Sequence, residues 1–331
     1  MIAALVWMSA AWAGVHVVRD GETVESILEA AGAPERAAEV RAMNGLPVGG
    51  QPKVSSVLDL PDDLAAADCQ PSYVRSAEGP GTVLVPGGAA ATPLVERIPL
   101  PIGSRVCTKD TGYATLRLAL DVGAGDFDDV TLMPNTCLTI RGSYGRSGAR
   151  TSLVQLDAGS VNVSEGSRPG NIAVQTLAGV TVGDDGGFRV TVEPDATRTE
   201  AVAADVVTLA AGAQVDVPEG FGGRTVVGEA PGQPVALLPP GALIAPESER
   251  ALRRPEFTWT AVPVALGYRL EISVSEDFSR VVTVVDYGSP SYVFRSLMLP
   301  NDTRQAWWRV SSIDRSGFVG VPSDARTFWM P

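Results

Sequence analysis

The sequence predicts a multidomain, mainly β protein in which one small strand–helix–helix–strand unit precedes two β-rich regions. The length of 331 residues exceeds the usual size of a single domain. Short runs rich in β-branched residues, separated by Gly, Asp and Asn turns, recur from residue 92 onward, and helical periodicity is confined to residues 14–62. The predicted segments are 1–13 (signal peptide), 14–62 (first unit), 63–91 (linker), 92–240 (β domain), 241–253 (linker) and 254–331 (β-sandwich).

The first residues, MIAALVWMSAAWA, form an apolar run too short to span a bilayer, and the run ends in the small-x-small triplet Ala11, Trp12, Ala13. This pattern favours a signal peptide cleaved before Gly14, and the alternative is a short N-terminus without a targeting role. No later stretch is long and apolar enough to predict a transmembrane helix. We therefore expect an exported protein of the periplasm or cell envelope, with no integral membrane segment once the signal is removed.

Charge and motif content exclude several classes of function. Lys and Arg number 26 against 38 Asp and Glu, a net charge of −12, which disfavours nucleic acid as a partner. No phosphate-binding loop, dinucleotide fingerprint or HExxH motif occurs, and the single histidine, His16, lies close to the predicted mature terminus. The acidic run at Asp126, Asp128 and Asp129 is interpreted as a solvated turn. The sequence thus predicts no catalytic residues, no cofactor and no metal site.

Residues 14–62 carry clear signals for two short helices between two strands. A turn at Asp20 and Gly21 follows the first strand, and Thr23 is placed to cap a helix. Gly32 is a helix stop, and Pro34 suits the first turn of a second helix that ends at Asn44-Gly45. The predicted apolar helix faces consist of Val24, Ile27, Leu28, Ala31, Ala37 and Val40, with Met43 as a further candidate.

This unit resembles the LysM domain. The resemblance rests on Val17-Val18, Asp20-Gly21-Glu22-Thr23, Ile27, Asn44-Gly45-Leu46, Leu58, Leu60 and Pro61. It departs from the family at Glu22, where Asp is usual, and in VGGQPKVSSV, which replaces a short loop. The resemblance implies a groove for N-acetylglucosamine polymers built by Asp20, Gly21, Glu22, Thr23, Asn44, Gly45, Leu46 and Pro47. The alternative is structural: the first loop caps one helix and the second ends the other.

The predicted β domain, 92–240, reads as an all-β sandwich, barrel or solenoid-like roll. GDDGGF, Gly183 to Phe188, is interpreted as a hairpin turn because it opens no helix. The region resembles the FecR domain in GSRVCTKDTGYATLRLA, VTLMPNTCLTI, VQLDAGSVNV and VPEGFGGRTVVGEAPGQPVALLPP, which occur in the family's order. Cys107 and Cys137 lie in this β-rich region, and the resemblance places them on strands that face each other, which implies a disulfide. Free thiols are the alternative, and Cys69 has no assigned partner.

Residues 254–331 alternate polar and apolar residues and contain EFTWTAV, GYRLEISVS and AWWRVSSID, a pattern similar to fibronectin type III domains. Trp259, Tyr268 and one of Trp307 or Trp308 are predicted core aromatics, which is favoured over stacking on sugar.

The function expected from these resemblances is non-enzymatic binding of peptidoglycan or another N-acetylglucosamine polymer in the cell envelope. The β domains would serve as scaffold or partner surface, with an envelope protein as a further candidate partner. Two alternatives stay open: a FecR-like regulatory or sensory protein that contacts an envelope receptor or signalling partner, and a cell-wall hydrolase.

Overall fold

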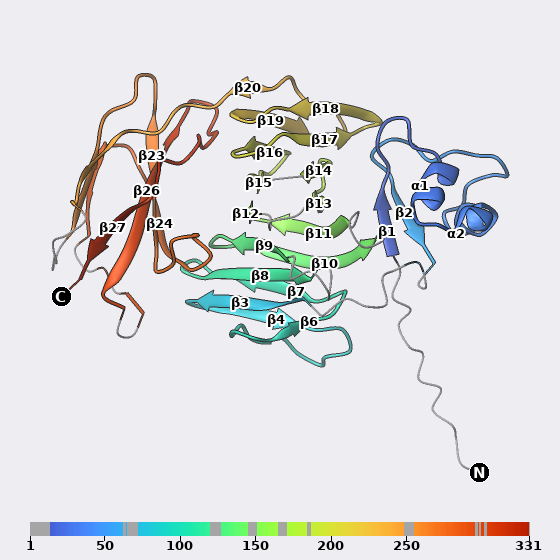
Figure 1. The fold of residues 1–331 in the computed structure, drawn as a ribbon, viewed down its shortest axis with the longest axis horizontal. Coiled ribbons are helices and arrows are strands. Elements are labelled where there is room, and N and C mark those ends of the chain that lie inside the picture. Colours follow the sequence, from blue (N-terminus) through green and yellow to red (C-terminus); the bar gives the residue numbers. More distant parts are fainter. Residues whose placement is uncertain are drawn as a thin grey trace, which may run out of the picture.

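The structure is a computed structural model that describes residues 14–61, 64, 72–119, 127–144, 151–164, 171–183, 187–247, 255–294, 297, 299–300 and 303–330. The expected signal peptide, Cys69 and Asp126 lie outside these residues. The described part is mainly β and has several sheets. It comprises an N-terminal unit (residues 14–61), a central stack of strands (72–236) and a C-terminal unit (243–330), seen from right to left in Figure 1. Among the described residues, no helix has the length and apolar character needed to cross a membrane.

The N-terminal unit places two short helices against one face of a two-stranded sheet. Its elements are β1 (Gly14–Val17), α1 (Val24–Ala30), the 3-10 helix η1 (Pro34–Arg36), α2 (Ala37–Met43) and β2 (Val57–Leu60). Strands β1 and β2 are antiparallel, with Gly14 opposite Leu60. The core beneath the helices consists of Val18, Val24, Ile27, Leu28, Ala31, Val40, Leu58 and Leu60. The apolar residues predicted to form the inner faces of the helices, Met43 apart, are thus the ones that pack: Ala37 lies against the edge of this core, and Met43 is exposed.

The central stack consists of two facing sheets of nine strands each. In spatial order, sheet 1 contains β18 (Ala213–Val217), β17 (Val206–Ala210), β14 (Val180–Gly183), β13 (Asn171–Gln175), β11 (Thr151–Ala158), β10 (Cys137–Tyr144), β7 (Arg105–Thr108), β4 (Gly81–Leu84) and β5 (Thr92–Pro93). Sheet 2 contains β20 (Val235–Ala236), β19 (Phe221–Val226), β16 (Ala196–Ala201), β15 (Phe188–Val192), β12 (Ser160–Ser164), β9 (Phe127–Leu132), β8 (Tyr113–Ala119), β3 (Ser72–Glu78) and β6 (Pro99–Leu100). The pairing is antiparallel except between β11 and β13.

The chain climbs the stack by passing repeatedly from one sheet to the other (Figure 1). One prediction is corrected: β14 pairs with β13 and β17 in sheet 1, whereas β15 pairs with β12 and β16 in sheet 2, so these two strands do not form the predicted hairpin. Residues 184–186 between them lie outside the described residues. The core between the sheets consists largely of Val and Leu, from Val74 in β3 to Val217 in β18. Threonine pairs also bridge the sheets, with Thr176 bonded to Thr197 and Thr181 to Thr199, each at 2.7 Å.

The predicted linker over residues 63–91 is wrong where β3 and β4 lie. Strand β3 pairs with β8 in sheet 2, and β4 pairs with β7 in sheet 1. Val74 and Val83 are buried in the core of the stack. Pro80, Pro86, Gly87 and Gly88, which suggested a linker, lie in the turns around these two strands, so the stack begins about twenty residues earlier than predicted.

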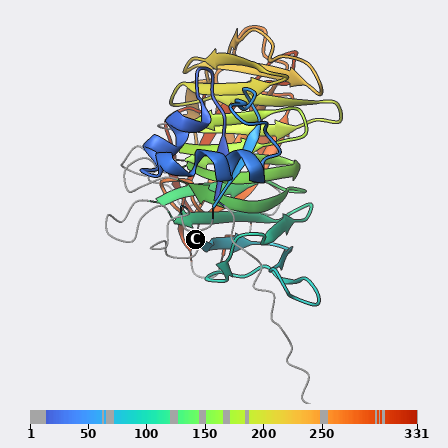
Figure 2. The same cartoon turned by 90° about the vertical axis from the view of Figure 1, so that its right-hand side faces the viewer.

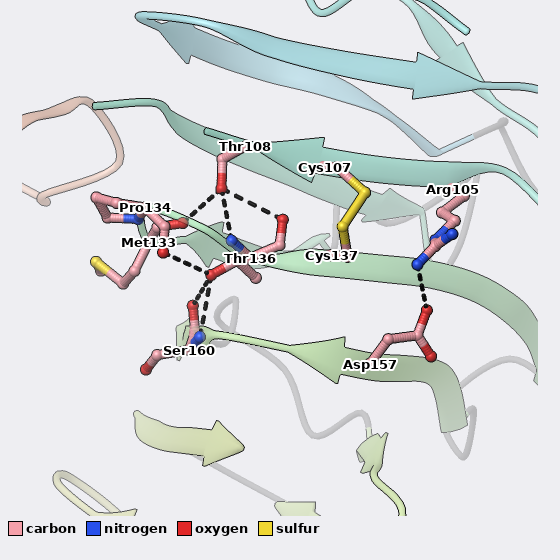
Figure 3. The surroundings of a disulfide bond; sticks show 9 residues. All are labelled: Arg105, Cys107, Thr108, Met133, Pro134, Thr136, Cys137, Asp157 and Ser160. Carbon is pink, nitrogen blue, oxygen red and sulfur yellow. Dashed lines mark hydrogen bonds and ion pairs between the residues drawn. A yellow bond between two sulfur atoms is a disulfide. The ribbon is translucent and has the colours of Figure 1, made fainter. Parts of the chain in front are cut away.

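Three turns of the stack interlock at one end (Figure 3). The hydroxyl of Thr108 donates to the carbonyl of Met133 at 2.6 Å and accepts from the Thr136 amide at 3.0 Å. The hydroxyl of Thr136 donates to the carbonyl of Ser160 at 3.1 Å and accepts from the Ser160 amide at 3.0 Å. Neighbouring Gly159 has φ +86°, and a Cβ there would lie 2.3 Å from Thr136 Oγ1. The sequence segments PNT and AGS therefore meet as one structural joint.

The C-terminal unit is a two-sheet sandwich. One sheet contains β21 (Leu243–Ala245), β22 (Glu256–Trp259) and β25 (Ser291–Val293), and the other contains β24 (Val281–Tyr287), β23 (Gly267–Ser273), β26 (Gln305–Ile313) and β27 (Arg326–Trp329). Since β21 pairs with β22, the predicted linker 241–253 is wrong at Leu243–Ala245. Trp259, Tyr268 and Trp308 are buried, which confirms the predicted core aromatics. Trp307 lies on the opposite face of β26 and is half-buried.

The two outer units pack on opposite faces of the stack. Val15 and Val17 of β1 bury against Leu153, Ala173 and Leu209 on the outer face of sheet 1, so the two-stranded sheet lies between the helices and the stack. Figure 2 shows the helices in front of the stacked strands. A second apolar cluster, Tyr113, Met133, Phe278 and Val281, joins sheet 2 to the C-terminal unit. The described residues therefore form one packed assembly, in which each outer unit packs against the stack.

Candidate functional site

The first predicted glycan-binding loop, Asp20 to Thr23, is partly engaged in internal contacts. Thr23 caps α1: its Oγ1 accepts from the Ser26 amide at 3.0 Å, and Ser26 Oγ accepts from the Thr23 amide at 2.9 Å. Asp20 and Gly21 are exposed, and Gly21 has φ +78°. The backbone amide of Asp20 donates to Gln214 Oε1 at 3.1 Å, so the loop also contacts the top of sheet 1.

Glu22 is held from the N-terminal side of the same loop. Its Oε2 lies 2.8 Å from His16 Nε2 and accepts from the Arg19 amide at 2.7 Å. Burial raises the pKa of Glu22, but the hydrogen bonds and positive charges of His16 and Arg19 outweigh it, so the net pKa is lowered. The Glu22 carboxylate thus stabilises the first loop through its contacts with His16 and Arg19.

In the second predicted loop, Asn44 to Pro47, Asn44 links α2 to β2. Its Nδ2 donates to the carbonyls of Val40 at 2.8 Å and Asp59 at 2.7 Å, and its Oδ1 accepts from the Asp59 amide at 2.8 Å. Gly45 has φ +64° and ends the helix, and Leu46 packs against the core of the unit. The Pro47 carbonyl accepts from Gly50 at 2.8 Å. Asn44 and Leu46 therefore support the loop and are not its outer surface.

Residues that the sequence analysis did not identify connect the start of α1, just after the first loop, to the segment just after the second loop. The amide of Val24 donates to Gln51 Oε1 at 3.0 Å, and Gln51 Nε2 donates to Glu25 Oε2 at 3.1 Å. Arg41 pairs with Glu25 and donates from Nε to the Gly50 carbonyl at 2.8 Å. The Arg41 hydrogen bond, followed by that of Gln51, lowers the pKa of Glu25 to about 2. No local pattern marks Gln51, because its role is a hydrogen bond to a residue 27 positions away.

We call the exposed residues of the two loops and of the segment after the second loop the rim. It consists of Asp20, Gly21, Gly45, Pro47, Val48 and Gly49. Val48 is fully exposed, at 104% of its reference area, although its side chain is aliphatic. Within the two predicted loops, Glu22, Thr23, Asn44 and Leu46 are thus partly buried, and Asp20, Gly21, Gly45 and Pro47 are exposed.

Cys107 and Cys137 form a disulfide across the outer face of sheet 1 (Figure 3). The S–S distance is 2.10 Å and the two residues are direct partners in the pairing of β7 with β10. Arg105 and Asp157 form an ion pair of 3.2 Å on the same side of the sheet. The bond closes a loop with a sequence separation of 30 residues, which stabilises the fold by roughly 3 to 4 kcal/mol in the chain-entropy model.

The acidic run expected to be a solvated turn is buried where the structure describes it. Asp128 and Asp129 belong to β9 and are 0% and 6% exposed. Asp129 Oδ1 accepts from Arg117 Nε at 2.9 Å, and Arg75 pairs with the other oxygen. Burial of a carboxylate is tolerated here because two guanidinium groups compensate its charge. Within the described ranges, no group of three His, Cys, Asp or Glu residues is arranged to hold a metal ion.

No protein-family model matches the chain, and no curated protein matches it. Among solved structures, a putative anti-sigma factor from Parabacteroides distasonis ATCC 8503 aligns over 40% of this chain and 57% of its own, with 12% identity and a TM-score of 0.29. The chain thus spans less than two thirds of that protein. The chicken CNTN1 FN1–FN3 domains align over 80% of this chain and 99% of their own, with 10% identity and a TM-score of 0.23.

Proposed function

We propose that this chain is a non-enzymatic, exported cell-envelope protein that binds N-acetylglucosamine-containing glycan, such as peptidoglycan, through the rim of its N-terminal unit. The observation that carries the proposal is that Gln51, Glu25 and Arg41 tie the start of α1, just after the first candidate loop, to the segment that follows the second loop, while residues of both loops stay exposed. The resemblance of residues 14–62 to the LysM domain supplies the ligand class. The central stack and the C-terminal unit then act as scaffold or partner surface.

The contacts available to a glycan follow from what the internal hydrogen bonds leave exposed. The Thr23 hydroxyl and the Asn44 amide are engaged within the unit, so they position the loops and do not contact ligand. The Asp20 carboxylate and the backbone of residues 45–49 offer acceptors and donors to acetamido groups and hydroxyls. Val48 offers an apolar contact for the acetamido methyl group. Such a shallow, exposed surface predicts weak binding to one sugar and stronger binding to a repeating polymer.

The disulfide supports the proposed location. Structural disulfides persist in oxidising compartments such as the periplasm and are rare in the cytosol. The Cys107–Cys137 bond therefore agrees with export, as does the apolar N-terminal segment of the sequence.

The test is co-sedimentation of the full chain with purified peptidoglycan, with chitin oligomers as competitors. Val48→Asp places a charge at the fully exposed rim position and should weaken binding at least tenfold without changing the melting temperature. Leu177→Asp is the matched control, because Leu177 is also an exposed aliphatic residue, at 81%, but lies in the stack. It should bind like the unaltered chain.

Failure of the unaltered chain to pellet, or equal loss of binding in both variants, would contradict the glycan proposal. The FecR-like regulatory alternative would then lead, and protein partners of the stack would be the next object of study.

A further inference from the structure

The C-terminal unit contains a pocket of about 790 Å³ whose walls come from segments far apart in the sequence. One wall is the connection Pro240–Leu243 that leads into β21, and the facing wall is the segment Val321–Thr327 that leads into β27. Glu276, at the tip of the β23–β24 hairpin, and Trp307 of β26 complete it. The N-terminal rim is on the other side of the stack (Figure 1).

Trp307, the tryptophan that lines this pocket, does not belong to the core cluster of the sandwich. Strand alternation places Trp308, which is fully buried, in the core and Trp307 on the opposite face. Trp307 packs along one side against the cluster that contains Phe278 and Val281, and Arg309 lies over the Phe278 ring at 3.9 Å. The indole is therefore held in place while part of its surface remains open to the pocket.

The walls are fixed before any ligand arrives. Arg326 donates from Nη1 to the Ile244 carbonyl at 2.9 Å and from Nη2 to the Leu243 carbonyl at 2.8 Å, which ties one wall to the other. The Ser323 amide donates to the Val310 carbonyl at 2.9 Å, which ties the second wall to β26. The amide of Ala242 donates to Thr260 Oγ1 at 2.8 Å. A pocket with preset walls binds its ligand at a smaller entropic cost than one that must close.

The polar groups of the pocket are mainly acceptors and hydroxyls. Glu276 and Asp324 are exposed carboxylates and Thr327 adds a hydroxyl, whereas the Ser323 hydroxyl donates to the Asp324 carbonyl at 3.0 Å and accepts from the Val310 amide at 3.2 Å. Vicinal hydroxyls of a sugar donate to carboxylates, and the apolar face of a pyranose ring stacks on an indole. The lining has two carboxylates, of Glu276 and Asp324, against the one guanidinium of Arg326, so negative charge prevails in the pocket and disfavours acidic sugars.

We propose that this pocket is a second saccharide site, which takes neutral or amino-bearing sugars by stacking on Trp307 and by hydrogen bonds to Glu276 and Asp324. It does not rest on the N-terminal rim. If both sites bind glycan, one molecule joins two strands of polymer across the width of the stack.

The test is calorimetric titration of the full chain carrying Val48→Asp, so that the rim does not contribute. The probes are cellohexaose, a glucosamine hexamer and an oligogalacturonate. We expect the first two to bind and the third not to bind. Trp307→Ala should weaken binding at least tenfold, whereas Trp329→Ala, which removes another partly exposed tryptophan outside the pocket, should leave it unchanged.

Because Trp307 also packs against Phe278, its substitution can affect folding, and Glu276→Gln and Asp324→Asn provide a second test at exposed positions. Each should weaken binding several-fold with an unchanged melting temperature. No binding of either expected probe, tighter binding of the acidic probe, or equal affinity of all these variants would overturn the proposal. Whether Val48→Asp loses peptidoglycan binding is a separate result, which tests the rim and not the pocket.

Discussion

At the scale of single residues, the joint between the PNT and AGS turns shows why one position requires glycine. A Cβ on Gly159 would lie 2.3 Å from Thr136 Oγ1 and 2.6 Å from Thr136 Cα, and the φ of +86° disfavours any other residue. We expect Gly159→Ala to lower the free energy of unfolding by about 2 to 4 kcal/mol, which combines backbone strain with overpacking.

The control for this prediction is Gly212→Ala. Gly212 has a similar φ of +79°, but a Cβ there meets nothing within 4 Å, so only the backbone term of about 1 kcal/mol applies. Urea denaturation of both variants separates the two terms. Equal losses at the two positions would show that the contact with Thr136 carries no energy.

At the scale of elements, the capping box of α1 decides whether a helix of seven residues persists. So short a helix is not stable alone and depends on its cap and its packed face. We expect Thr23→Ala to destabilise the protein by about 1 kcal/mol and Thr23→Ser to be nearly neutral, because Ser keeps the acceptor for the Ser26 amide. Glycan binding measured well below the melting temperatures of both variants should be the same, and a selective loss in Thr23→Ala would instead assign Thr23 to the ligand surface.

Elements marked by local chemistry were predictable from the sequence. Thr23 capped the expected helix, Asn44-Gly45 ended the next one, and the alternation in β26 placed Trp308 in the core. Features that depend on distant partners were not predictable. The pattern of Val15 and Val17 indicates one buried face, but it does not reveal that the covering surface is sheet 1, more than a hundred residues away.

The candidate site likewise contains features with local sequence signals and features that depend on distant partners. Its loops were found because turn and cap residues have local signatures. Gln51 was missed because its role is a long-range hydrogen bond to the Val24 amide, which no periodicity encodes. Strands β3 and β4 were missed because each is short and flanked by Pro or Gly, a composition that is also typical of linkers.

At the scale of the whole molecule, the two docking interfaces differ in chemistry. The N-terminal unit docks mainly through aliphatic side chains such as Val15 and Val17. The C-terminal unit docks through polar and charged groups as well: the Ser279 carbonyl accepts from Ser76 at 2.8 Å and from Thr115 at 2.7 Å, and Arg280 pairs with Glu78 at 3.0 Å. Changes of pH therefore act chiefly on the C-terminal interface.

We expect acid to destabilise the protein chiefly by protonating Glu271. It is fully buried, and Arg309 Nε donates to its Oε2 at 2.8 Å. Burial raises its pKa, but the charges of Arg309 and Arg189, the Arg309 hydrogen bond and the charge of Arg269 outweigh it and lower the pKa to about 2. Because the folded value is below the ordinary 4.5, this carboxylate stabilises the fold above pH 4.5, and that contribution is lost as the pH falls toward 2.

The pKa of Glu200, in β16 of sheet 2, is shifted in the opposite direction. Burial raises its pKa despite the nearby charges of Arg189 and Arg198, so its contribution is present below pH 4.5 and is lost as the pH rises through its folded value. Substitution of each glutamate in turn therefore separates their effects on the pH dependence of stability.

We expect Glu271→Gln to be less stable than the unaltered chain near pH 7, by about 3 to 5 kcal/mol, because Arg309 is left without its partner.

That stability difference should narrow steadily between pH 4.5 and pH 2, as the unaltered chain protonates the same carboxylate. Glu200→Gln should instead gain stability relative to the unaltered chain as the pH rises through the range in which Glu200 ionises, because the unaltered chain then loses the contribution of its protonated carboxyl group. Urea denaturation at half-unit steps of pH measures both. A Glu271→Gln difference that stays constant down to pH 2 would show that this buried carboxylate does not govern acid sensitivity, and the exposed pairs at the interface would then have to account for it.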